Sequence, residues 1–131
     1  MSKVAVVYWS GTGHTQAMAK AAGADLITAA EFGPDQVPAY DAIAFGCPAM
    51  GAEVLEEEEF QPMFDAVKPA LNGKKIALFG SYGWGDGEWM RSWEEDCLGA
   101  GAVLACESVI CQDEPDDDAL AACEKLGETL K

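Results

Sequence analysis

The sequence has 131 residues, half of them hydrophobic, and a formal net charge of −15 at pH 7. Its size and composition favour a single globular domain over residues 1–131, and they argue against a disordered chain and a membrane span. The negative charge argues against nucleic acid and membrane surfaces as partners, because phosphate groups would be repelled. It favours a protein partner with a basic docking face, although an acidic surface also serves solubility alone.

The first segment of the chain, MSKVAVVYW, starts directly as a β-strand pattern. It lacks the basic start and the long apolar run of a signal peptide, so we expect a cytoplasmic protein. The five cysteines are an odd number and none forms a CxxC pair. We therefore expect reduced thiols, with neither disulfides nor a metal site.

Short apolar runs alternate with helical patterns along the chain. The runs predict five strands, at Lys3–Tyr8, Asp25–Ala30, Ala42–Gly46, Lys75–Gly80 and Ala102–Ile110. The patterns between them predict four helices, at Thr15–Ala22, Glu57–Ala70, Glu88–Gly99 and Asp117–Leu130. This alternation is typical of an α/β fold with a parallel sheet, in which ligands bind beyond the carboxyl ends of the strands. The loops after the first, third and fourth strands are therefore the candidate binding loops.

The loop after the first strand reads WSGTGHT. It lacks the Gly-Lys-Ser/Thr of a P-loop and the third glycine of a dinucleotide fingerprint. Its hydroxyls and its flexible glycines at a helix start predict an anion nest that suits a terminal phosphate. A polar turn with a helix cap is the plainer alternative, and His14, the single histidine, is either a phosphate donor or a surface residue. The nest consists of Ser10, Gly11, Thr12, Gly13, His14 and Thr15.

The other two candidate loops each carry one large side chain among glycines. GCPAMGAEVLEE places Met50 after the third strand, and GSYGWGDGEW places Trp84 after the fourth. Both side chains reach the same rim of the predicted sheet, where they would form a slot for a flat ring. The plainer alternative is that Met50 and Trp84 pack in the hydrophobic core. A phosphate nest beside such a slot suggests a mononucleotide cofactor.

Three segments, in this order, carry a family resemblance: VYWSGTGHT, GCPAMGAEVLEE and ALFGSYGWGDGEWMRSWEE, with EPDDD before the last helix. They resemble the short-chain flavodoxins of anaerobic bacteria, which bind FMN non-covalently. The resemblance covers nearly the whole chain. It implies a flavodoxin-like three-layer sandwich: a five-stranded parallel sheet in the order 2-1-3-4-5, with helices on both faces and FMN at the switch point.

The resemblance also implies the residues that bind the cofactor. The first loop would hold the phosphate, Met50 would lie on the inner face of the flavin and Trp84 on its outer face. Glu53 would bond the N3 edge of the ring. The full implied set is Ser10, Gly11, Thr12, Gly13, His14, Thr15, Pro48, Ala49, Met50, Gly51, Ala52, Glu53, Ser81, Tyr82, Gly83, Trp84 and Gly85.

The implied function is that of a low-potential one-electron carrier, which shuttles FMN between semiquinone and hydroquinone and serves redox enzymes with basic faces. It would not itself be an enzyme. A flavodoxin-like FMN enzyme, such as a quinone reductase, is the alternative. A phospho-receiver domain has a similar sheet but needs acids after the first and third strands, where this chain has Trp9 and FGCPAM.

The chain departs from the resembling family in three places. Only residues 16–22 separate Thr15 from Gly23, so the first helix is shortened. We expect the sheet face beside it to be covered by Phe32 and Tyr40, or by another chain in what is otherwise a monomer. His14 and Ala52 also replace the usual residues. In the turn at 50–53, Gly51 favours a type II′ geometry, which would present its carbonyl to flavin N5–H.

Overall fold

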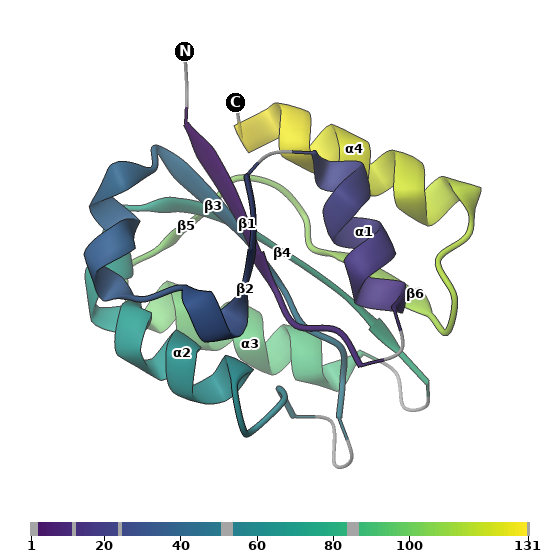
Figure 1. Ribbon diagram of the computed structural model, residues 1–131, viewed down its shortest axis with the longest axis horizontal. Coiled ribbons are helices and arrows are strands. Elements are labelled where there is room, and N and C mark those ends of the chain that lie inside the picture. Colours follow the sequence, from purple (N-terminus) through teal and green to yellow (C-terminus); the bar gives the residue numbers. More distant parts are fainter. Residues whose placement is uncertain (1–2, 12, 24, 51–53, 84–86, 131) are drawn as a thin grey trace.

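The computed structural model describes residues 3–11, 13–23, 25–50, 54–83 and 87–130. Figure 1 shows a sheet between two layers of helices, with α1 and α4 on one face and α2 and α3 on the other. This arrangement is the expected three-layer α/β sandwich.

The sheet is parallel and has the predicted order, β2-β1-β3-β4-β5. Its first four strands are β1 (Val4–Tyr8), β2 (Asp25–Thr28), β3 (Ala42–Gly46) and β4 (Lys75–Tyr82). Strands β1 and β3 lie at the centre and are buried on both faces, which is why their sequences show no polar alternation. The order reverses between β1 and β3, and the loops that follow these strands therefore diverge at one edge of the sheet.

The fifth strand was predicted as one piece, Ala102–Ile110, and this prediction was wrong. The structure divides it into β5 (Val103–Leu104) and β6 (Val109–Gln112), both of which pair with β4. Leu104 lies opposite Ile76, and Val109 lies opposite Phe79. Between these two pairs, the edge segment has four residues, whereas β4 has only two. The extra residues form an irregular bulge, and Ser108 within it donates a 2.6 Å hydrogen bond to Glu94 of α3.

The four predicted helices are present. They are α1 (His14–Ala22), α2 (Phe60–Val67), α3 (Glu88–Gly99) and α4 (Asp117–Leu130). Helix α2 begins later than predicted and continues as the 3-10 helix η3 (Lys68–Leu71), which contains Pro69. Two further 3-10 helices, η1 (Ala29–Glu31) and η2 (Pro34–Ala39), lie in the segment before β3. None of the helices in the described ranges is long and apolar enough to cross a membrane.

Helix α1 is short, as expected, but the prediction that Phe32 and Tyr40 cover the sheet face beside it was wrong. Phe32 is buried and Tyr40 half-buried, and both pack in the aromatic cluster under α2 and α3, on the opposite face. The face beside α1 is covered by α4, which packs on small strand residues such as Ala44 and Ala77. Gly127 lets α4 approach so closely that a Cβ there would overlap the carbonyl of Ala22.

Candidate functional site

A cavity of about 240 Å³ lies beyond the carboxyl ends of β1, β3 and β4. Three separate loops contribute to it, together with one residue that follows β6. Its lining residues are Trp9, Gly11, His14, Pro48, Ala49, Met50, Ser81, Tyr82, Gly83 and Asp113. The candidate site predicted from the sequence therefore coincides with a real hollow at the switch point of the sheet.

The start of α1 lies next to this cavity. Gly13 adopts φ 94°, a left-handed conformation that glycine tolerates, and its N–H donates to Ser10 Oγ at 3.0 Å. Thr15, in the first turn of the helix, is only 1% exposed. Its Oγ1 lies 3.5 Å from Oγ of Ser81 on β4. Two hydroxyls and a helix N-terminus thus meet at one point, an arrangement that suits an anion.

The loop after β3 is fixed from beneath by Cys47. Its carbonyl accepts a hydrogen bond from Trp89 Nε1 at 3.3 Å, and its Sγ accepts the N–H of Glu56 at 3.3 Å. Gly80 on β4 allows the Cys47 carbonyl to lie close to that strand, since a Cβ at residue 80 would overlap the carbonyl. Burial raises the pKa of the Cys47 thiol to about 12, so it stays a neutral thiol that supports the loop.

The same loop closes through a short antiparallel bridge. Met50 and Val54 exchange two backbone hydrogen bonds, of 2.8 and 3.2 Å. Two residues later the buried carboxylate of Glu56 accepts the N–H groups of Glu58, Glu59 and Phe60. Burial alone would raise the pKa of Glu56, but these three donors outweigh it and lower the pKa below its usual value. The acid therefore anchors the loop to the start of α2.

The loops after β4 and β6 are joined on the other side of the cavity. The N–H of Asp113 donates to the carbonyl of Tyr82 at 2.7 Å, and Gln112 reaches the carbonyl of Gly83 at 3.5 Å. The Tyr82 ring lies 5.5 Å from that of Trp89, measured between centroids, in a tilted arrangement. Ala49 N–H donates to Ser81 O at 2.9 Å, which ties this side to the loop after β3.

The structure brings many of the predicted site residues together. Those that line the cavity are Gly11, His14, Pro48, Ala49, Met50, Ser81, Tyr82 and Gly83. Ser10, Gly13 and Thr15 lie beside it at the start of α1, with Ser10 also lining a neighbouring cavity of about 340 Å³. Six predicted residues lie outside the described part of the chain: Thr12, Gly51, Ala52, Glu53, Trp84 and Gly85.

The sequence-based site missed two residues that line the cavity, Trp9 and Asp113. Trp9 precedes the first loop directly, and its indole N–H donates to Glu59 Oε1 at 2.9 Å. Asp113 follows the last strand and adopts φ 58°, which aspartate tolerates better than most residues. Extending the search to the loop after the fifth strand would have found Asp113, because that strand ends at the same edge of the sheet.

The arrangement offers different chemistry at its two ends. Hydroxyls and backbone N–H groups gather at the start of α1, whereas Met50, Tyr82 and Trp9 give the cavity an apolar and aromatic lining. Within the described ranges, no group of three or more histidine, cysteine or acidic residues is placed to hold a metal ion. The site therefore suits an organic ligand with one anionic end and one flat end.

Comparisons with known proteins agree with this geometry. Residues 6–127 match the family described as Flavodoxin. The chain is 43% identical to a flavodoxin from Clostridium beijerinckii, over 95% of this chain and 96% of that protein. It is 45% identical to one from Megasphaera elsdenii, with the same shares covered. The solution structure of two-electron reduced Megasphaera elsdenii flavodoxin superimposes with a TM-score of 0.83 and 44% identity, covering 97% of each chain.

Proposed function

The chain belongs to the flavodoxin family, and on this premise we propose which of its residues hold the cofactor and what its partners present. The protein is an FMN-binding, low-potential electron carrier, not an enzyme, and it works with other redox proteins. The alternative of a quinone reductase is therefore set aside. We assign separate roles to the residues at the two ends of the cavity.

The observation that carries the proposal is the meeting of Thr15 and Ser81 beside the cavity. In our proposal, the phosphate of FMN is held by the hydroxyls of Ser10, Thr12 and Thr15 and by backbone N–H groups at the start of α1. These donors fit a dianionic phosphate without a cationic side chain, since a helix N-terminus carries partial positive charge. The N-cap residue of α1 is Gly13, which has no side chain of its own to occupy this end, and its N–H donates to Ser10 Oγ.

The apolar part of the cavity would hold the ring. Met50 lies in the loop after β3 and Tyr82 is the last residue of β4, so both can contact one flat group between them. Pro48 and Ala49 also line the cavity, where they would exclude water from that group. The further roles of Glu53 and Trp84, at the ring edge and the outer face, rest on the family pattern of the sequence.

When bound, FMN supplies the one-electron chemistry. The chain's own residues set the surroundings in which this occurs. Asp113 lines the cavity, and the whole chain carries a net charge of −15, so further negative charge at the site is opposed. This opposition favours a low potential.

We further propose that the redox partners dock through basic faces. The support is charge complementarity with a strongly acidic chain, which steers encounter and sets orientation more than it adds affinity. Asp113 and Gly83 are exposed at the mouth of the cavity, so a basic group of a partner can approach the cofactor there.

Titration of the apoprotein with FMN and with riboflavin tests the phosphate site. We expect Thr12→Ala with Thr15→Ala to weaken FMN binding by about tenfold or more, because hydrogen bonds to a charged group are lost, while riboflavin binding changes little. Thr129→Ala, which removes a hydroxyl from an exposed position on α4, is the matched control. If the double variant weakened the binding of FMN and of riboflavin equally, the phosphate would have to lie elsewhere.

A further inference from the structure

Strand β6 forms the outer edge of the sheet. In the part of the chain that the structure describes, β6 pairs with β4 alone. Peptide groups of a parallel strand bond alternately to its two sides. The N–H of Asp113 donates to the carbonyl of Tyr82 on β4. The peptide groups of Val109 and Cys111 therefore also face β4, whereas those of Ile110 and Gln112 point to the open edge. Such an edge is a template for another strand.

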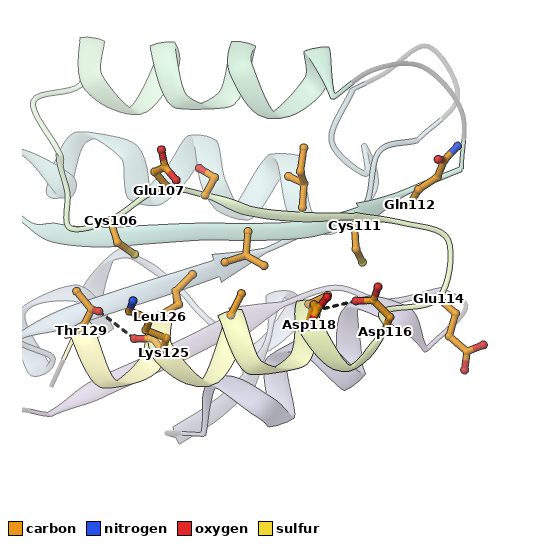
Figure 2. Close-up of a pocket in the computed structure, with 15 residues that line it drawn as sticks. Cys106, Glu107, Cys111, Gln112, Glu114, Asp116, Asp118, Lys125, Leu126 and Thr129 are labelled. Atoms are coloured by element: carbon orange, nitrogen blue, oxygen red, sulfur yellow. Dashed lines mark hydrogen bonds between the residues drawn. The ribbon is translucent and has the colours of Figure 1, made fainter.

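A cavity of about 740 Å³ lies between this edge segment and α4. Figure 2 shows Cys106 and Cys111 pointing from the strand segment toward α4, which carries Leu126 and Lys125 on the other side. The apolar residues Val109, Ala119, Ala122 and Leu126 line it. Its acidic residues are Glu107, Glu114, Asp116 and Asp118, against a single cation among the lining residues, Lys125. The α4 side of the edge is therefore negative as well as hollow.

A second cavity, of about 230 Å³, lies on the α3 side of the same segment. It is lined by Gly87, Met90, Arg91, Glu94, Glu107, Ser108 and Ile110. Ser108 donates to Glu94 at 2.6 Å, which holds the segment against α3, and Ile110 is 39% exposed. Met90 and Ile110 contribute apolar surface to this smaller hollow, beside the charged Arg91, Glu94 and Glu107. The one edge is thus flanked by a hollow on each face.

We propose that β6 is the docking site for an extended basic segment of a partner protein, which adds to the sheet as a further strand. Side chains of a strand alternate between its two faces, so successive residues of the added segment would enter the two cavities in turn. Lysine or arginine suits the acidic cavity beside α4, and an aliphatic residue suits the side of Met90 and Ile110. A second copy of this chain is the poorer occupant, because each copy carries a charge of −15.

The test uses the FMN-loaded protein and two peptides of equal composition. One is Lys-Val-Lys-Val-Lys-Val-Lys, and the other, Lys-Lys-Lys-Lys-Val-Val-Val, keeps the charge and loses the alternation. We expect the alternating peptide to bind about tenfold more tightly, with NMR amide shifts concentrated at residues 107–112. Equal binding of the two peptides would mean general electrostatic attraction and would overturn the proposal.

Two pairs of variants locate the contact. Ile110→Pro removes the outward N–H, whereas Ile110→Val keeps it, so only the proline should abolish the preference for the alternating peptide. Asp118→Lys should weaken binding of that peptide more than Glu128→Lys, which changes the net charge equally at a position outside the cavity. If peptide binding did not differ within either pair of variants, the proposal would be overturned. A dimer of this chain that Ile110→Pro disrupts would also overturn it. The visible absorption of bound FMN reports separately on the cofactor site.

Discussion

The carboxylate of Glu56 is buried, and it accepts a hydrogen bond from the backbone N–H of Phe60, also buried, at 2.8 Å. Two more N–H groups, from Glu58 and Glu59, bond to the same carboxylate. The start of α2 is therefore built around one ionised acid, and the backbone of Glu56 is itself bonded to the thiol of Cys47 below the candidate site.

Glu56→Gln should destabilise the protein at neutral pH by about 1–2 kcal/mol, since the amide is a weaker acceptor for three N–H donors. The folded-state pKa of Glu56 is lowered, so its stabilisation is present above the unfolded pKa and is lost as pH falls through the folded value. Urea unfolding at several pH values should show the wild type and the variant converging in acid. Glu58→Gln, at an exposed position, is the control. A difference that does not narrow in acid would contradict this role.

Gly127→Ala should destabilise the fold by about 1–3 kcal/mol, because its Cβ would overlap the backbone carbonyl of Ala22. Gly99→Ala is a matched helical substitution with no atom within 4 Å of the added Cβ, and we expect it to be neutral or slightly stabilising. Thermal unfolding of both variants checks the contrast. Similar losses of stability would mean that α1 and α4 do not meet as described.

Thiol labelling should separate the five cysteines into two groups. Cys47, Cys97 and Cys123 are buried, and burial raises the pKa of each to about 12. Cys106 and Cys111 are partly exposed, and burial also raises their pKa, that of Cys111 to about 11. The native protein should therefore label slowly at only two positions near pH 8, faster as the pH rises, and at all five in denaturant. Mass spectrometry identifies the sites, and early labelling of Cys123 would count against the packing of α4.

Docking through a basic face makes electron transfer salt-dependent. We expect the rate toward a basic haem protein to fall by about tenfold or more between low salt and roughly 0.5 M salt, as screening removes long-range attraction. A neutral small-molecule acceptor should show almost no such decrease. Stopped-flow kinetics compares the two acceptors, and equal salt dependence would remove the case for a basic partner face.

Most of the fold was predictable because its signals are local. The buried strands β1 and β3 show apolar runs without alternation, and α3 and α4 have the predicted bounds. The division of the fifth strand was not predictable, since it depends on the contact of Ser108 with Glu94 of another element. Nor does helix length determine which face Phe32 covers, because that depends on the path of the segment before β3.

The candidate site was predictable in part for the same reason. Loops after β1, β3 and β4 carry dense polar or glycine-rich motifs, and these loops line the cavity. Asp113 has no such motif around it, and Glu56 acts through three backbone groups that only the folded turn brings to it. The proposed flip of the turn at 50–53 and the stacking of Trp84 concern residues outside the described ranges and remain predictions from the sequence.

The covering of one sheet face by α4 has a consequence for synthesis of the protein. Helix α4 follows every other element in the chain, yet Val4 and Val6 of the first strand are buried in the same cluster as Cys123 and Leu126. A ribosome adds about 5–20 residues per second, so only α1 covers this face while the rest of the chain is made. A nascent chain that stops before α4 would expose apolar strand surface to chaperones, whereas the loops of the cofactor site would already be complete.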